Sequence, residues 1–230
     1  MDMASFLDST NLRPEASDSD IRHLCMEAAS YKMAAVCVNP FRLALAGRLL
    51  SGSEVKLCTV IGFPLGADRL SGKIYSASKA LEDGADELDM LINIGAVKDQ
   101  DLITVGQEID ELLALKKERN FISKIIVETA LLTVNELIML TRLINNSGAD
   151  FIKTSTGFST RGVNLQDIHI INEHKSKELK VKASGGIKSL DFALELLDLG
   201  VNRLGTSCAG ILIRDYQGIN KAEYSEDFLR

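Results

Sequence analysis

Tryptophan is missing from this 230-residue chain, and aromatic residues make up only 5% of it. Proteins that stack bases or sugars need aromatic platforms, so such platforms are scarce here. An excess of positive charge is missing too: 26 Lys and Arg face 32 Asp and Glu, which leaves a net charge of −6. Because a nucleic-acid backbone is bound by clustered Lys and Arg, the acidic balance argues against a nucleic-acid partner.

Cysteine is also sparse. Cys25, Cys37, Cys58 and Cys208 lie far apart and form no Cys-x-x-Cys pair. No apolar run approaches the roughly 18 residues that a membrane span needs. The first eight residues have neither the basic nor the apolar segment of a signal peptide. We therefore expect reduced thiols, no membrane partner and a cytoplasmic location.

Linker segments are absent as well, since the chain has only three prolines and no Ser/Gly-rich stretch. The hydrophobic content of 46% and the charged content of 25% are typical of a globular protein. A chain of this length can bury a large core without disulfides or metals. We therefore expect residues 1–230 to form one domain, a size that suits barrels and large sandwiches.

Short runs rich in β-branched residues alternate with helical patterns along the whole chain. The expected strands are Phe6–Asp8, Ala34–Asn39, Lys56–Gly62, Glu87–Asn93, Lys124–Thr129, Phe151–Ser155, Val181–Ser184 and Arg203–Ser207. Helix starts are indicated by the cap cluster Asp18–Asp20, by Thr133 with Glu136 as a capping box, and by Ser189.

A repeated unit is indicated by Gly84-Ala85-Asp86, Gly148-Ala149-Asp150 and Gly200-Val201-Asn202, each of which ends a helix and leads into a strand. Strands that alternate with single helices favour parallel βαβ units. Eight such units predict an α/β fold of the (β/α)8 TIM-barrel type. An open doubly wound sheet is the alternative, weakened because no G-x-G-x-x-G follows the early strands.

In a TIM barrel the active site lies at the carboxyl ends of the strands, so polar residues there are the candidates. Lys153 and Lys182 lie within adjacent predicted strands, and Asp89 interrupts an apolar one. Repulsion between two lysines and their desolvation both lower a lysine pKa, which would free an amine nucleophile near neutrality. Asp89 would then transfer protons, with Lys182 as its counter-ion. The alternative is structural, with lysines that reach solvent and a carboxylate in a salt bridge.

Glycines follow the last two strands, at Gly185-Gly186 and at Gly205-Thr206-Ser207. Barrels hold phosphate at this position, because glycine lets backbone N–H groups and helix N-termini approach an anion. A metal is not expected, since the three histidines all fall in predicted helices and form no ligand pair. A serine triad has no G-x-S-x-G elbow either.

Five segments together resemble deoxyribose-phosphate aldolases, which are class I aldolases. They are KTSTGF (153–158), VKASGG (181–186), GADELDM (84–90), VCVNP (36–40) and CTVIGFPLG (58–66). The resemblance runs in order from about Asp8 to Gly205. It implies reversible cleavage of 2-deoxy-D-ribose 5-phosphate to D-glyceraldehyde 3-phosphate and acetaldehyde, in deoxyribose catabolism and without a cofactor. It also implies a homodimer or homotetramer that acts on small phosphorylated sugars and aldehydes.

The same resemblance implies roles for individual residues. Lys153 would form the Schiff base, Lys182 would lower the pKa of that nucleophile and join the proton relay, and Asp89 would act as acid and base with water. The substrate-binding residues would be Asp8 and Thr10 near the sugar, Cys37 near the aldehyde, and Gly157, Gly185, Gly186, Gly205 and Ser207 around the phosphate.

The sequence departs from the family pattern at four positions. Ser9 stands where many bacterial members have histidine, Cys208 replaces a serine of the phosphate loop, and Phe158 replaces a lysine. Tyr224 is followed by six residues, whereas some members end in tyrosine. Two other functions remain open: a sugar-phosphate isomerase, which would not need two lysines, and a barrel that binds a metabolite without catalysis.

Overall fold

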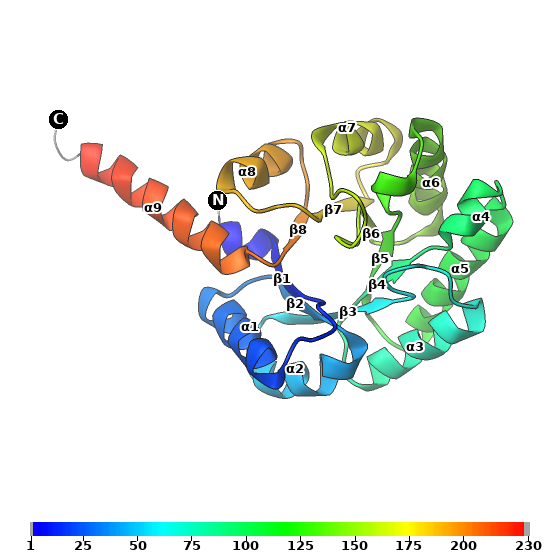
Figure 1. Ribbon diagram of the computed structural model, residues 1–230, viewed down its shortest axis with the longest axis horizontal. Coiled ribbons are helices and arrows are strands. Elements are labelled where there is room, and N and C mark those ends of the chain that lie inside the picture. Colours follow the sequence, from blue (N-terminus) through cyan, green and yellow to red (C-terminus); the bar gives the residue numbers. More distant parts are fainter. Residues whose placement is uncertain (1, 228–230) are drawn as a thin grey trace.

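The computed structural model describes residues 2–227, and the side chains among them as far as residue 218. Tyr224 therefore lies outside the residues whose side chains are described. Eight parallel strands close into a barrel in chain order, and β1 pairs with both β2 and β8 (Figure 1). The strands are β1 (Leu7–Asn11), β2 (Ala35–Val38), β3 (Lys56–Ile61), β4 (Glu87–Leu91), β5 (Ile122–Ile126), β6 (Phe151–Lys153), β7 (Lys180–Ser184) and β8 (Arg203–Thr206).

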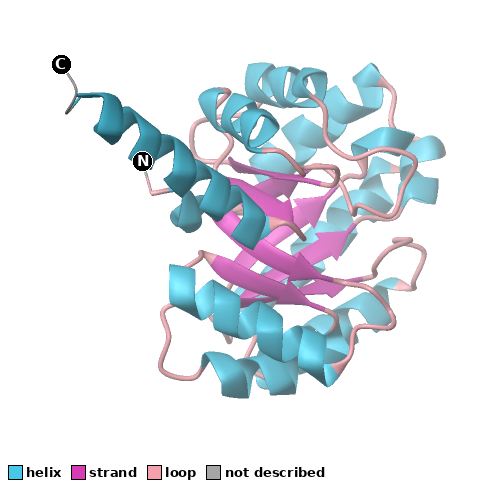
Figure 2. Ribbon diagram, turned by 60° about the vertical axis from the view of Figure 1, so that its left-hand side comes forward, coloured by secondary structure: helices cyan, strands magenta, loops and turns pink. Residues whose placement is uncertain are grey.

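Helices surround the strands on the outside (Figure 2). The α-helices are α1 (Asp18–Tyr31), α2 (Leu43–Leu50), α3 (Leu70–Glu82), α4 (Ile94–Lys98), α5 (Leu102–Ala114), α6 (Val134–Ser147), α7 (Leu165–His174), α8 (Leu190–Asp198) and α9 (Ala209–Asp227). The 3-10 helices are η1 (Met3–Phe6), η2 (Pro40–Arg42), η3 (Leu115–Lys117) and η4 (Thr129–Leu131). Figure 1 shows α9 leaving the barrel and projecting past the N-terminus.

The TIM-barrel prediction is confirmed, and the pairing of β1 with β8 excludes the open sheet. All eight expected strands are present; some ends match and the others are shifted by at most three residues. The first begins at Leu7 and extends to Asn11, beyond the expected end at Asp8. The glycines at 84, 148 and 200 have φ values of 96°, 85° and 84°, as expected for residues just past a helix.

Side-chain caps fix the helix starts. The Thr133–Glu136 capping box and the Ser189 cap are confirmed. The first helix differs from the expectation, because Ser17 is its cap and shares a capping box with Asp20. Asp18 thus lies inside the first turn, where a carboxylate interacts favourably with the helix dipole.

Alternation along the strands separates an apolar layer between strands and helices from an interior that holds charged side chains beside a small apolar cluster of β2 and β3. Leu88 and Met90 of β4 belong to the core packed between strands and helices. Because successive side chains of a strand point to opposite faces, Glu87 and Asp89 point into the barrel. The same alternation on β7 directs Val181 outward and Lys182 inward. The fold thus concentrates charge inside the barrel.

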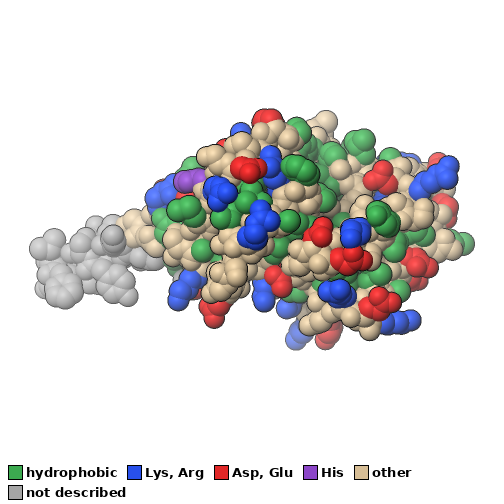
Figure 3. Space-filling view, turned by 90° about the horizontal axis from the view of Figure 1, so that it is seen from below, with side chains coloured by type: hydrophobic (Ala, Val, Ile, Leu, Met, Phe, Trp, Pro, Cys, Tyr) green, Lys and Arg blue, Asp and Glu red, His purple; other side chains and the backbone are tan. Residues whose placement is uncertain are grey.

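The outer surface of the described chain bears on the expectations for membrane helices and for charge distribution. No helix of the described chain is both long and apolar enough to cross a membrane. On the face seen in Figure 3, acidic and basic side chains are interspersed around smaller apolar areas.

Candidate active site

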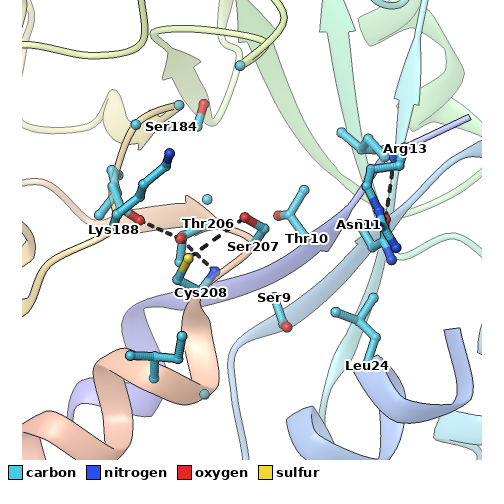
Figure 4. A pocket seen from close by; sticks show the side chains of 18 of the residues that line it. Ser9, Thr10, Asn11, Arg13, Leu24, Ser184, Lys188, Thr206, Ser207 and Cys208 are labelled. Carbon is cyan, nitrogen blue, oxygen red and sulfur yellow. Dashed lines mark hydrogen bonds between the residues drawn. The ribbon is translucent and has the colours of Figure 1, made fainter. Parts of the chain in front are cut away.

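A cavity of about 940 Å³ opens at the carboxyl ends of the strands. Its walls come from the loops after β1, β6, β7 and β8, together with α1 and the start of α9. In Figure 4, Ser9 and Thr10 of β1 lie beside Thr206 at the end of neighbouring β8 and beside Ser207, which follows it. Predicted substrate-binding residues that line the cavity are Thr10, Gly157, Gly185, Gly186, Gly205 and Ser207.

The three predicted catalytic residues converge inside the barrel. Lys153 at the end of β6 lines the cavity although its residue is only 2% exposed. Its Nζ lies 2.7 Å from Oδ2 of Asp89, and Nζ of Lys182 lies 2.7 Å from the same oxygen. The fold thus places the side-chain nitrogens of Lys153 and Lys182 around one carboxylate oxygen of Asp89, and all three groups lie within proton-transfer distance.

The pKa of Lys182 is not set by repulsion between neighbouring lysines alone. Burial would lower the pKa of Lys182, but the carboxylates of Asp8 and Asp89 hold it above its usual value. The two carboxylates therefore outweigh both burial and the repulsion from Lys124 at Lys182. Burial would likewise raise the pKa of Asp89, but Lys124, Lys153 and Lys182 hold it well below its usual range.

Lys124 is a member of this cluster that the sequence did not identify. Its Nζ lies 2.7 Å from Oδ1 of Asp89 and 2.6 Å from Oε2 of Glu87. The Lys124 side chain is fully buried. Although burial would lower its pKa, Asp89 and Glu87 contribute to holding the pKa of Lys124 well above the usual value.

Asp8 and Arg203 complete the interior cluster. Asp8 lies beneath the cavity, where its carboxylate contacts Lys182 at 2.5 Å and Arg203 at 2.5 Å. Burial would raise the pKa of Asp8, but these two cations lower it to about 2. Arg203 also reaches Oε2 of Glu87 at 3.1 Å. Asp8 is thus tied to buried cations, whereas its neighbour Thr10 faces the cavity.

Two thiols lie beside this cluster. Cys37 and Cys58 are paired in the β2–β3 register and are fully buried. The Cys58 thiol donates to Oδ1 of Asp89 at 3.2 Å. A hydrogen bond from Cys58 lowers the pKa of Cys37, whereas burial raises the pKa of Cys58 well above its usual value. Cys37 therefore lies in the barrel interior beside the cluster that includes Lys153.

Metal ligation is geometrically possible in this region, contrary to what the histidine positions suggest. Ligand atoms of Cys37, Cys58 and Asp89 lie within 4.8 Å of one another, as do those of Asp8, Cys58 and Glu87. Every carboxylate in these two groups is already paired with lysine or arginine. A cation placed there would meet ammonium and guanidinium groups, so the charge distribution disfavours a resident metal.

The side of the cavity formed by the ends of β7 and β8 and by the start of α9 suits an anion. Backbone at Gly185, Gly186 and Gly205 lines it next to the first turn of α9, whose N–H groups and dipole favour negative charge. Thr206 fixes this loop, since its hydroxyl donates to the Ile187 carbonyl and accepts from the Cys208 amide (Figure 4). Lys188, which the sequence did not single out, adds a cation to the lining.

Close backbone packing holds the loop after β6 against the loop after β7. A Cβ built on Gly162 would lie 2.0 Å from the carbonyl oxygen of Gly185, so only glycine fits there. The buried Glu128 carboxylate accepts from both the amide and the hydroxyl of Thr156. These contacts place Gly157 at the cavity edge in a fixed position.

Comparison with known proteins gives one consistent result. A family model described as DeoC/LacD family aldolase matches residues 3–210. A deoxyribose-phosphate aldolase of Thermococcus gammatolerans is 46% identical over 225 residues, covering 97% of this chain and 99% of that protein.

Solved structures agree. An aldolase called QR15 has a TM-score of 0.91 at 35% identity and covers 96% of this chain and 99% of its own. A deoxyribose phosphate aldolase from Aeropyrum pernix, described as having a unique tetrameric structure, has a TM-score of 0.87 at 32% identity. That match covers 94% of this chain and 92% of the other.

Proposed function

The chain belongs to the DeoC/LacD family of aldolases, and from this membership we propose that it cleaves 2-deoxy-D-ribose 5-phosphate reversibly through a Schiff base on Lys153. The products are D-glyceraldehyde 3-phosphate and acetaldehyde. Relatives named deoxyribose-phosphate aldolase match along nearly their full length, so the chain is an enzyme of this kind. The observation that carries the mechanism is the Lys153 amine, which lines the cavity while contacting the buried Asp89 carboxylate at 2.7 Å.

Covalent catalysis solves the main chemical difficulty of this cleavage. Breaking the C2–C3 bond directly would leave the negatively charged enolate of acetaldehyde, which is too high in energy to form readily near neutral pH. When the Lys153 amine condenses with the C1 aldehyde, water leaves and an iminium forms, and the electron pair of the broken bond then enters a neutral enamine. Protonation at C2 and hydrolysis release acetaldehyde and regenerate the amine. The chain's own lysine supplies the electron sink, so the proposal includes neither metal nor organic cofactor.

Protons move through the groups around Lys153. A base must remove the C3 hydroxyl proton, and an acid must later protonate the enamine carbon. Asp89, the Lys182 ammonium and a water molecule provide this base and acid. Asp89 Oδ2 touches both lysines, so a proton released at one can pass to the other without leaving the cavity.

The phosphate group is assigned to the glycine-lined side of the cavity. The amides near Gly185, Gly186 and Gly205, together with Ser207 and Lys188, offer donors to a dianion. Thr10 lies on the β1 side, where it can contact the sugar hydroxyls. This arrangement extends the substrate across the barrel mouth with C1 directed at Lys153.

Borohydride trapping tests the proposal. Incubation with acetaldehyde or deoxyribose 5-phosphate, followed by reduction and peptide mapping, should leave an N-ethyl group on Lys153. Lys153→Met should give no adduct and no turnover. The matched control is Lys180→Met, which changes a lysine on neighbouring β7 whose residue is exposed and should leave trapping intact.

Two results would refute the assignment. An adduct on another lysine would place the nucleophile elsewhere, and the absence of any adduct together with retained turnover would favour chemistry without a covalent intermediate. An isomerase would interconvert a phosphorylated aldose and ketose without trapping. A barrel that only binds a metabolite would show neither trapping nor turnover.

We also propose a cellular setting for this activity. A phosphorylated sugar carries charge that keeps it inside the compartment where it forms, which supports a role in deoxyribose catabolism in the cytoplasm. The tetrameric description of the Aeropyrum pernix relative supports a homo-oligomer. Analytical ultracentrifugation would distinguish monomer, dimer and tetramer.

A further inference from the structure

Inside the barrel, six charged side chains form a closed circuit of ion pairs, here called the ion-pair ring; five are buried, and the Arg203 side chain is 11% exposed. Its members in order are Asp89, Lys124, Glu87, Arg203, Asp8 and Lys182. The successive N–O distances are 2.7, 2.6, 3.1, 2.5, 2.5 and 2.7 Å. Lys153 lies outside the ring and joins it only at Asp89.

The charges of the ring cancel, since three carboxylates face three cations. Lys153 would be a fourth cation if protonated, with no fourth carboxylate in the ring to match it. Among ionisable groups outside the ring, the Cys37 thiol of β2 interacts electrostatically with Lys153, and the Cys58 thiol of β3 contacts Oδ1 of Asp89. An uncompensated charge in a buried site is costly, whereas a neutral amine leaves the whole cluster uncharged.

We propose that the ion-pair ring keeps Lys153 in its uncharged, nucleophilic form, and that Lys124, Glu87 and Arg203 are positioning residues of the reaction. This inference rests on the proposed function, because it concerns the amine that forms the Schiff base. Lys124 and Arg203 act without touching substrate: Lys124 orients Oδ1 of Asp89, and Arg203 bridges Glu87 to Asp8.

The pH dependence of trapping separates this role from a purely structural one. The readout is the pH at which borohydride trapping of acetaldehyde on Lys153 is half maximal. Lys124→Met removes a cation and leaves the ring negative, which favours the Lys153 ammonium and should raise this midpoint by about one pH unit. Glu87→Gln removes an anion and should lower the midpoint by about the same amount.

A second cation on the far side of the ring provides an independent variant. Arg203→Met should raise the midpoint as Lys124→Met does, although it acts from β8 instead of β5. The double variant Glu87→Gln/Lys124→Met removes one charge of each sign, and its midpoint should return close to the wild-type value. Circular dichroism identifies the variants that fold, and any one folded single variant tests the sign of the shift.

The matched control is the other buried ion pair, Lys73–Glu108, whose atoms lie 2.7 Å apart. Lys73 donates to the Leu91 carbonyl, and Glu108 accepts from the Asn93 amide, so this pair supports the end of β4. Lys73→Met and Glu108→Gln break a buried pair of the same type without changing the charge of the ring. They should lower stability and leave the trapping midpoint unchanged.

The outcomes are distinguishable. Opposite shifts for removal of a cation and removal of an anion support the proposal. Shifts of the same sign, or no shift in a folded variant that still traps, would overturn it and leave the ring a structural feature. If the wild-type chain itself forms no adduct on Lys153, the proposed function fails instead.

Discussion

Lys153 and Lys182 meet at a single atom, since each Nζ lies 2.7 Å from Oδ2 of Asp89. Without that carboxylate, the buried Lys182 ammonium would lose one of its two anionic partners. The Asp89 carboxylate therefore has an electrostatic role besides the proton transfer proposed for it, because with Asp8 it holds the pKa of Lys182 above the usual value.

Asp89→Asn should accordingly damage both activity and stability. The amide leaves Lys124 and Lys182 without their shared anion, and breaking a buried ion pair in this way costs about 3–5 kcal/mol. Loss of the proton-transfer group should lower kcat by about a hundredfold or more. Urea denaturation and steady-state kinetics measure the two effects. The exposed Asp110→Asn is the matched control, and unaltered stability in Asp89→Asn would contradict the expected charge balance.

Acid should destabilise the fold through Asp8. The pKa of Asp8 is about 2 in the folded chain against an ordinary 3.8. As the pH falls, Asp8 is therefore protonated in the unfolded chain at a higher pH than in the folded chain. The stabilisation is therefore complete above about pH 4 and is lost as the pH falls towards about 2, with a magnitude of about 2 kcal/mol. Asp89, whose pKa is also lowered, acts in the same direction. Urea unfolding across this range should show the decline, and Asp8→Asn should flatten it while Asp110→Asn does not.

Chelation should leave turnover unchanged. The carboxylates that could join Cys37 and Cys58 in holding an ion are already paired with cations. Exhaustive dialysis against EDTA followed by an activity assay tests this expectation. Activity that disappears after dialysis and returns with zinc would be incompatible with it.

Cys208 should be the first thiol to react with iodoacetamide. It lines the cavity and is partly exposed, whereas Cys37 and Cys58 are fully buried and burial raises the pKa of Cys25 to about 11. The lowered pKa of Cys37 favours its reactive thiolate, whereas its burial hinders the reagent. The order of labelling therefore shows whether solvent exposure or thiol pKa controls the reaction. Peptide mapping over time gives the order of labelling, and Cys208→Ser should remove the fastest site. Initial labelling of Cys37 would mean that the barrel interior opens readily.

Gly162→Ala should separate the loops after β6 and β7. The new methyl group would overlap the Gly185 backbone, and overpacking of this kind costs about 1–3 kcal/mol. Because both loops line the phosphate side of the cavity, KM for the phosphorylated sugar should rise more than KM for deoxyribose. Gly72→Ala on α3 meets no atom within 4 Å and serves as the control. Equal KM values in both variants would argue against a fixed loop.

The sequence predicted the barrel because its signals are local. Strand and helix patterns, the Thr133–Glu136 capping box and the repeated Gly-x-Asp or Gly-x-Asn ends each depend on a few neighbouring residues. The predicted strand ends were less accurate where contacts between distant residues determine where a strand stops. β5, for example, ends at Ile126 because Glu128 adopts a left-handed backbone with φ 52° to reach Thr156.

The motifs identified Lys153, Lys182 and Asp89, but Lys124, Glu87 and Arg203 were missed. Each stands first in the strand that the sequence predicts for it, where a solvent-exposed end is expected, although Lys124 is in fact the middle residue of β5. Their burial depends on the stagger of the closed barrel, which pairs Asp89 with Lys124 and Lys182 with Arg203. The available signal was the spacing of Glu87 and Asp89, two positions apart and hence on the same inward face.

The ion-pair ring divides its charges unequally along the chain. Its three carboxylates come from β1 and β4, and its three cations come from the later strands β5, β7 and β8. An amino-terminal half-barrel would thus gather only negative charge into its interior, and a carboxyl-terminal half only positive charge. Neither half could exclude water from that interior alone, since buried charges need partners. Closure of the barrel therefore joins two electrostatically complementary halves, which makes folding of the interior an all-or-none event.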